Sequence, residues 1–308
     1  METIVKSIKG GGSSTLHHRG ALHRAIGFFL ICTIPICLVW APLKNLSALV
    51  VKNNTFTYIP LIPIVSLYFV FIERKSIFSK ISYGWAIGSA LIVPGIIGLV
   101  LSRLNLSQLI SYNQGSLLML ALVLLWSGAF AVFFGNGSIQ RASFPLLFLL
   151  FMIPIPEPLL SQTIFMLQQG SGKTAEWIFD MFGVPYFRQG LVFALPGVAI
   201  RVAEECSGIR GSLALLITTV LASQLFLRKT WNKLLLCAVV VPMAILKNGL
   251  RIATLSALAV YVNPGFLTGR LHQQGGIIFF MMGLLPIGLL LVLLQKVEKP
   301  ALAVAKDS

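Results

Sequence analysis

Eight apolar runs, most of them close to 20 residues long, follow one another along the chain and are separated by short loops that carry lysine and arginine. An α-helix rises 1.5 Å per residue, so about 20 residues cross a hydrocarbon core of roughly 30 Å. A helix also bonds all of its backbone polar groups within one segment, as hydrocarbon requires. Because 56% of the residues are hydrophobic and only 11% are charged, the pattern predicts an all-α polytopic membrane protein and excludes an ordinary soluble domain.

The apolar runs divide the chain into a predicted order of segments. The predicted spans are residues 25–43, 58–72, 82–101, 116–134, 142–156, 207–227, 234–253 and 275–295. The resulting organisation is a flexible basic tail (1–24), five transmembrane helices (25–156), an extramembrane insertion (157–205), three transmembrane helices (206–295) and a second tail (296–308). Gly84 and Gly88, four residues apart, are expected to form a helix-packing surface.

The basic residues predict the orientation. The two tails, the loops ERKSIFSK and RKTWNK and Arg141 hold 14 of the 24 lysines and arginines. Short loops rich in these residues stay in the cytoplasm, so both termini are expected there and the insertion on the opposite side of a bacterial plasma membrane. The net charge of +15 is therefore read as a topology signal, and the lipid bilayer, with no nucleic acid, is the expected environment.

The insertion is predicted to contain short elements of two kinds. Its first half, LLSQTIFMLQQ and AEWIFDMF, suggests two short amphipathic helices at the membrane interface. Its second half, YFRQGLVFALPGVAIRVAEE, suggests two strands that form a β-hairpin around Leu195-Pro196-Gly197.

No metal or cofactor site is expected. Three of the four cysteines, Cys32, Cys37 and Cys237, lie inside apolar runs, and no cysteine or histidine cluster has ligand spacing. The string GSGKT at 170–174 resembles the end of a phosphate-binding loop, but Leu167 stands where that loop needs a glycine and no strand is expected before it.

The fourth cysteine, Cys206, lies in EECSGIRG, a dense polar stretch in an apolar chain. Ser207 and Gly208 are expected to cap the helix that follows, and a helix start together with Arg210 favours a thiolate. Glu204 and Glu205 oppose this effect. Local chemistry alone leaves two interpretations open, a reactive nucleophile and an inert interfacial thiol.

Two further polar residues lie in unusual places. Arg251, with Asn248 one turn earlier on the same face, sits inside an apolar run, where a charge is costly and is most often functional; the alternative is an arginine that extends to the interface. His272 is the one histidine predicted on the outer side and is a candidate general base, although a lone interfacial histidine is commonly only polar. Counted along the helices from the cytoplasmic ends, Arg251, Cys206 and His272 lie at about 25, 30 and 33 Å, so all three are expected in one outer layer.

The stretches VAEECSGIRGSLALL, KNGLRIATLS and LHQQGGIIFF, with FMIPIPEPLL upstream, resemble the exosortases, membrane cysteine enzymes related to archaeosortases. The resemblance covers roughly residues 145–285, and the amino-terminal half fits only in general hydropathy. It implies Cys206 as the nucleophile, with Arg251 and His272 as essential residues.

The resemblance also implies a substrate class. These are secreted proteins with a carboxy-terminal sorting signal, made of a Pro-Glu-Pro-like motif, a transmembrane helix and a short basic cluster, cleaved on the outer side of the membrane through a thioester. Whether Arg251 stabilises the oxyanion or holds a substrate carboxylate stays open, as does hydrolysis against transfer. The residues expected to bind substrate or to support the site are Arg201, Ser207, Arg210 and Asn248.

The alternative function is a transporter or an exopolysaccharide export component without peptidase activity, in which Arg251 and Arg201 would line an anion path. Transporters tend to show repeated halves or paired broken helices. Neither is visible in this sequence, and the polar residues cluster at the outer rim of the predicted membrane domain without continuing through its midplane.

Overall fold

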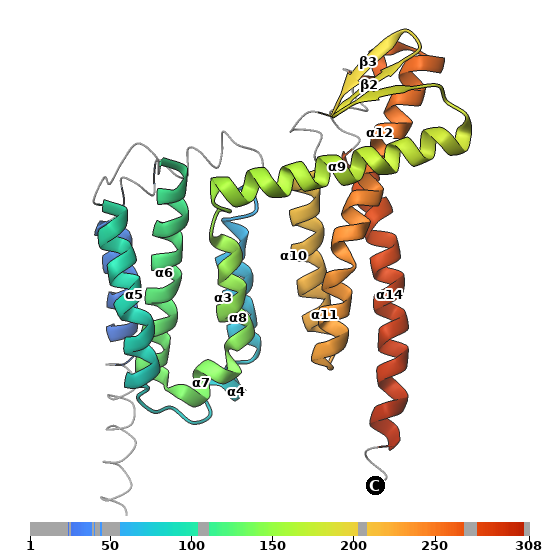
Figure 1. The fold of residues 1–308 in the computed structure, drawn as a ribbon. Coiled ribbons are helices and arrows are strands. Elements are labelled where there is room, and N and C mark those ends of the chain that lie inside the picture. The colour runs from blue at the N-terminus through green and yellow to red at the C-terminus, as the bar shows by residue number, and fades with distance from the viewer. Residues whose placement is uncertain are drawn as a thin grey trace, which may run out of the picture. The chain divides into compact units, whose positions relative to one another are not determined.

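The structure is a computed structural model that describes residues 24, 26–38, 40, 44, 56–103, 111–202, 208–267 and 276–304. It is mostly helical and contains one small three-stranded sheet (Figure 1). The chain divides into two compact units, Met1–Glu157 and Pro158–Ser308, and each unit is described separately.

Five helical segments of the described residues are long and apolar enough to cross a membrane: Trp85–Ser102, Gln114–Phe134, Ile209–Phe226, Thr230–Tyr261 and Gly276–Glu298. A sixth is obtained if Ser143–Met152 and Glu157–Phe182, which are bent at a break, are counted as one. Ile26–Leu38 and Leu61–Ile72 are shorter apolar helices. The prediction of an all-α polytopic membrane protein is therefore confirmed, and several of the expected spans are shorter helices.

Among the described residues of the first unit, seven helical elements follow the apolar helix Ile26–Leu38. They are α3 (Leu61–Ile72), α4 (Arg74–Ile77), α5 (Trp85–Arg103), α6 (Ser111–Phe134), α7 (Asn136–Arg141), α8 (Ser143–Phe148) and the 3-10 helix η3 (Leu149–Met152). Helices α5 and α6 lie side by side. A Cβ atom on Gly88 would lie 3.1 Å from the carbonyl oxygen of Gly128, and one on Gly84 would lie 2.6 Å from that of Ala131. The predicted glycine packing surface is confirmed.

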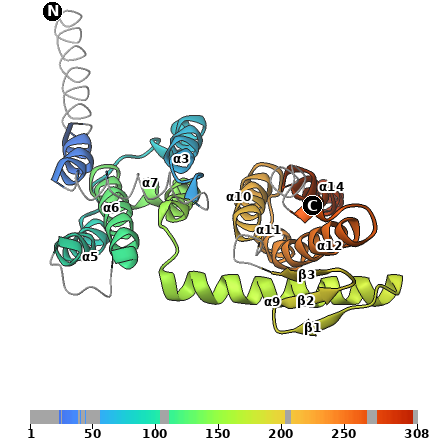
Figure 2. The same ribbon diagram turned by 90° about the horizontal axis from the view of Figure 1, so that it is seen from above.

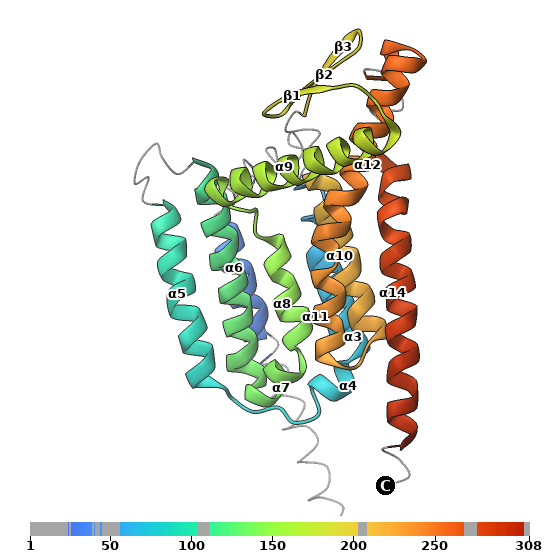
Figure 3. The ribbon, with the colours of Figure 1, turned by 45° about the vertical axis from the view of Figure 1, so that its right-hand side comes forward.

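The second unit carries the sheet and the remaining helices. Its elements are α9 (Glu157–Phe182), β1 (Phe187–Gln189), β2 (Val192–Leu195), β3 (Val198–Arg201), α10 (Ile209–Phe226), α11 (Thr230–Ala238), α12 (Val240–Tyr261), the 3-10 helix η5 (Pro264–Leu267) and α14 (Gly276–Val304). Helices α10, α11, α12 and α14 contact one another as a bundle, and α9 runs across it (Figures 2 and 3).

Helix α9 differs from the sequence prediction. Two short amphipathic helices were expected in the first half of the insertion, whereas one continuous helix, Glu157–Phe182, covers both stretches. The small residues between them, Gly170-Ser171-Gly172, do not end the helix, because they are packed against other elements. A Cβ atom on Gly170 would lie 3.1 Å from the side chain of Ile245 on α12, and one on Gly172 would lie 3.1 Å from Nη2 of Arg188 on β1. Tertiary packing here overrides the low helix propensity of glycine.

The predicted β-hairpin is confirmed as β2 and β3, which pair antiparallel through Leu195 and Val198. Gly197 in its turn has φ +77°, a backbone conformation that suits glycine. A third strand, β1, was not predicted; it is only three residues long and pairs with β2 at the edge of the sheet.

Helix α12 extends further than the predicted span, which ended at residue 253. It continues to Tyr261, and with α11 it forms an apolar stretch from Thr230 to Tyr261. The additional turns are stabilised by the sheet: Ile252 and Ala253 belong to a buried cluster with Phe193, and Val260 packs against it. β3 is the strand that contacts α12, as Figure 2 shows.

A buried carboxylate closes the end of the bundle at which α10 ends and α11 begins. Glu298 of α14 is 4% exposed and accepts hydrogen bonds from the backbone N–H groups of Arg228 and Lys229, at 2.8 and 3.0 Å, and from Asn232 Nδ2 at 2.8 Å. Arg228 and Lys229 belong to the turn between α10 and α11, and Asn232 belongs to the first turn of α11. The bonds hold α14 against that turn and satisfy donors that a helix start leaves open.

Candidate active site

The residues predicted for the site fall into two groups. Arg201, Arg210, Asn248 and Arg251 belong to the described part of the second unit. Cys206, Ser207 and His272 lie outside the described residues. The described part of the site includes β3 and α10, which precede and follow Cys206 in the chain, and η5 and α14, which precede and follow His272.

Gly208 is the N-cap of α10, two residues after Cys206 in the chain. Its φ of +77° is left-handed, and its carbonyl oxygen accepts hydrogen bonds from the backbone N–H and from the hydroxyl of Ser212, both at 2.8 Å. The expectation that a helix starts here is confirmed. Arg210, in the first turn, is exposed.

Asn248 lies directly against this helix start. A Cβ atom on Gly208 would lie 2.9 Å from both Cγ and Oδ1 of Asn248, so a larger residue would collide with the amide. Asn248 is 3% exposed, and its Nδ2 donates to the hydroxyl of Ser171 on α9 at 3.1 Å. One buried amide therefore touches α9 and the start of α10 together.

Helices α9 and α12 approach closely at this level. A Cβ atom on Gly249 would lie 2.9 Å from the carbonyl oxygen of Ser171 and 2.6 Å from Cγ2 of Thr174. The string GSGKT therefore lies inside α9, and its residues Gly170, Ser171 and Thr174 form the crossing with α12. Ser171 was not predicted as a site residue; the only signal in the sequence was this run of small residues in an amphipathic helix.

A second buried amide holds the chain that leads toward Cys206. Gln168 of α9 is 6% exposed, and its Nε2 donates to the carbonyl oxygen of Val202 at 2.8 Å. The N–H of Val202 donates to the carbonyl oxygen of Leu191 at 2.9 Å. Arg201, at the end of β3, is exposed. Both backbone groups of Val202 are thus fixed four residues before Cys206.

Arg251 is half-buried on α12, three residues after Asn248 and hence on the same side of the helix. It does not lie at the end of its helix, as the predicted span implied, because α12 continues ten residues further to Tyr261. The turns beyond Arg251 pack against the sheet instead of facing lipid.

Lys247 is a cation that the sequence analysis did not single out. It precedes Asn248 on α12, is 8% exposed and lies one turn before Arg251. Its side chain runs between α10 and α14: a Cβ atom on Gly211 would lie 2.6 Å from Nζ, and one on Gly283 would lie 2.9 Å from Cδ. The sequence signal for Lys247 was the string KNGLR, which places two cations in an apolar run.

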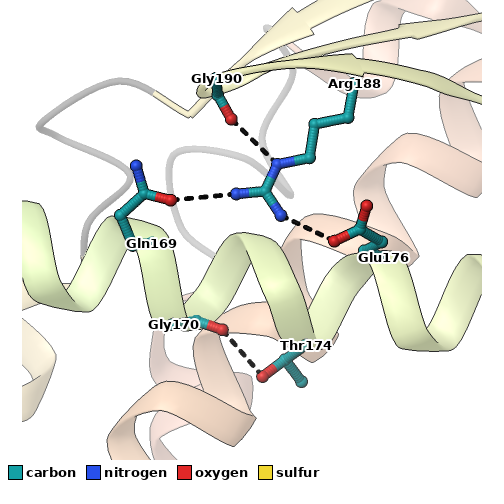
Figure 4. A network of polar contacts seen from close by, with 6 residues as sticks. All are labelled: Gln169, Gly170, Thr174, Glu176, Arg188 and Gly190. Carbon is teal, nitrogen blue, oxygen red and sulfur yellow. Dashed lines mark hydrogen bonds and ion pairs between the residues drawn. The ribbon is translucent and has the colours of Figure 1, made fainter.

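An ionic network fixes the sheet on α9 (Figure 4). The guanidinium of Arg188 on β1 donates to Glu176 Oε2 at 2.8 Å, to Gln169 Oε1 at 3.1 Å and to the carbonyl oxygen of Gly190 at 2.9 Å. It also lies 5.3 Å from the ring centre of Phe193. The network therefore joins β1, β2 and α9 through one side chain.

The sequence was compared with models of known protein families. Residues 50–289 match the family model described as "Transmembrane exosortase (Exosortase_EpsH)". The chain belongs to the exosortase family. The match takes in both units of this exosortase and includes the segments that contain Cys206, Arg251 and His272. Neither a curated protein nor a solved structure matches the chain.

Proposed function

We propose that this exosortase is a membrane cysteine peptidase or transpeptidase that cleaves the carboxy-terminal sorting signal of secreted, membrane-anchored proteins. Cys206 is the nucleophile, His272 the general base and acid, and Arg251 the cation that stabilises developing negative charge. The proposal rests on family membership and on one structural relationship, the packing of Gly208 against Asn248 one turn before Arg251.

The covalent chain supports the pairing of Cys206 with Arg251. Consecutive Cα atoms are 3.8 Å apart, so the Cα of Cys206 lies within about 8 Å of that of Gly208. Gly208 touches Asn248, and residues three apart on a helix have their Cβ atoms roughly 5–6 Å apart. We therefore propose that the thiol and the guanidinium act on the same substrate carbonyl.

The reaction follows from these roles. The Cys206 thiolate attacks the scissile carbonyl carbon while His272 holds the thiol proton, and the carbonyl oxygen becomes an oxyanion. Arg251 stabilises that oxyanion, and the start of α10 presents backbone N–H groups to the same region. The carbon–nitrogen bond then breaks, His272 gives its proton to the leaving amine, and a thioester remains that water or a second amine resolves.

We further propose the orientation that the basic residues predict. At the far end of the second unit, Arg228, Lys229 and Lys233 lie in the region that Glu298 closes. Short loops rich in lysine and arginine stay in the cytoplasm. The α10 start, the sheet and Arg251 accordingly face the outside of the plasma membrane, where a secreted substrate is available.

The decisive experiment is a complementation assay in cells that lack the native gene and express a substrate with a sorting tail. The wild-type protein is expected to shorten the substrate, and Cys206→Ala is expected to accumulate it uncut while inserting normally. Hydroxylamine should release a substrate fragment from the wild-type enzyme, because it cleaves thioesters. Processing by Cys206→Ala would refute the cysteine mechanism, and a transport defect with intact processing would favour an export function.

A further inference from the structure

Lys247 has a structural setting that the proposed reaction does not use. Its side chain is buried between α10, α12 and α14, in a slot whose walls are the glycines Gly211 and Gly283. Any side chain on either glycine would meet the lysine: a Cβ atom would lie 2.6 Å from Nζ at Gly211 and 2.9 Å from Cδ at Gly283. Glycine at positions 211 and 283 thus leaves the space that the Lys247 side chain occupies between the three helices.

The ammonium group has no counter-charge within reach among the described residues. Lys247 takes part in no hydrogen bond or ion pair there, and its charged neighbour is Arg251, which has the same sign. Glu298 is the one acid in the described parts of α10, α12 and α14, and it already accepts three hydrogen bonds at the far end of the bundle. A buried charge without a partner costs several kcal/mol, so an anion brought to the ammonium group would remove a substantial penalty.

The position of Lys247 separates its role from that of Arg251. Four residues of α-helix correspond to about 6 Å, so Lys247 and Arg251 lie at different levels of α12, and the ammonium group of Lys247 lies beside Gly211 in the first turn of α10. Its charge is therefore separate from that of Arg251, the cation assigned above to the attacked carbonyl. An anion bound at Lys247 would therefore come from a part of the substrate next to the reacting bond.

We propose that Lys247 binds a carboxylate side chain of the peptide substrate and so selects substrates with an acidic residue near the cleaved bond. The inference rests on the proposed function, because it assumes a peptide substrate. At Gly211 and Gly283 no side chain covers the lysine, and Gly211 belongs to the first turn of α10, the part of that helix that follows Cys206 in the chain. A lipid phosphate, which stays with its headgroup at the interface, would not reach a lysine that is 8% exposed.

The test uses the full-length enzyme in proteoliposomes of neutral lipid and two membrane-anchored substrates. One has glutamate in its Pro-Glu-Pro-like segment and the other has glutamine at that position. The wild-type enzyme is expected to have a kcat/KM for the glutamate substrate roughly 10- to 100-fold higher, the range for a hydrogen bond to a charged group. Lys247→Met is expected to process both substrates at similar, low rates, whereas Lys247→Arg retains part of the preference.

Two further variants keep the result interpretable. Lys296→Met makes the same change at an exposed position of α14 and is expected to keep the full preference. Gly211→Ala places a methyl group against Nζ, which can swing aside because it is the end of a flexible chain. This variant is expected to insert normally and to lose the preference, so it tests the proposal even if Lys247→Met folds poorly.

The outcomes separate the two proposals. If the wild-type enzyme cleaves neither substrate, the proposed function is wrong. If it cleaves both and Lys247→Met keeps the wild-type preference for glutamate, only the role of Lys247 is overturned. A Lys247-dependent change that follows the anionic-lipid content of the vesicles, and not the peptide acid, would overturn the assignment to a peptide carboxylate.

Discussion

Gly208 and Asn248 are packed so closely that no side chain fits between them: a Cβ atom on Gly208 would lie 2.9 Å from Oδ1 of Asn248. This contact joins the start of α10 to the middle of α12. Because Cys206 precedes Gly208 by two residues and Arg251 follows Asn248 by three, the contact lies close along the chain to both the proposed nucleophile and the proposed cation.

Gly208→Ala is the first prediction. The methyl group would meet the Asn248 amide, and alanine at φ +77° costs about 1–2 kcal/mol by itself. We expect processing to fall at least about 100-fold, because a small misplacement of catalytic groups has effects of that order. The measurement is the processing rate of a tailed substrate at equal enzyme level.

Gly197→Ala is the matched control for this prediction. Gly197 has the same φ of +77° but no atom within 4 Å of an added Cβ, so it suffers the backbone strain without the collision. We expect modest destabilisation and nearly normal processing. Equal activity losses in the two variants would show that the Gly208–Asn248 contact has no special importance.

The second prediction concerns the support beneath Asn248. Ser171→Ala removes the buried hydroxyl that accepts from Asn248 Nδ2, and losing a buried partner costs about 1–3 kcal/mol. We expect a lower thermal midpoint and slower processing, since the amide that touches Gly208 loses this hydrogen bond to α9. Thr174→Val, three residues on, removes only a local hydrogen bond to the carbonyl of Gly170 and should retain activity. A fully active Ser171→Ala enzyme would contradict the positioning role of Asn248.

Much of the fold could be predicted from hydropathy because the bilayer restricts the chain so strongly. The apolar runs define the helices through length and composition alone, and the β-hairpin was visible because Pro196-Gly197 interrupts two alternating strands. The continuity of α9 and the length of α12 were not predictable in the same way. Both depend on packing, through Gly170 against Ile245 and Ile252 against Phe193.

The site was predictable where a residue is costly in its local setting. Arg251 and Asn248 are conspicuous in an apolar run, and Asn248 does lie against the start of α10. Ser171 and Gln168 are ordinary residues of an amphipathic helix, and only the folded structure shows that their side chains are buried against α12 and Val202. Lys247 was visible in the sequence, but its burial between two glycines depends on three separate helices.

The third prediction concerns the Arg188 network of Figure 4. Arg188→Lys keeps the charge but loses the planar group that bonds Glu176, Gln169 and the Gly190 carbonyl at once. We expect the backbone amides of β1 and β2 to exchange hydrogen about 10-fold faster, because the sheet is less firmly held on α9. Hydrogen-exchange mass spectrometry measures this, with Lys173→Met on the exposed side of α9 as the control. Unchanged exchange would mean that the apolar cluster around Phe193 suffices to hold the sheet.

The fourth prediction separates stability from catalysis. Glu298→Gln replaces a carboxylate oxygen with an amide nitrogen, so one of the donors at Arg228, Lys229 or Asn232 loses its acceptor in a buried place. The loss of charge-assisted hydrogen bonds is expected to lower the free energy of unfolding by about 2–3 kcal/mol. Lys296→Gln, two residues earlier and exposed, should leave the free energy of unfolding unchanged.

Glu298 lies at the far end of α10 from Gly208. The Glu298→Gln variant should therefore unfold at a lower temperature, while its processing rate at low temperature stays close to the wild-type value. A large loss of activity in a fully folded Glu298→Gln enzyme would show that the two ends of the bundle are coupled, contrary to the local role inferred for this carboxylate.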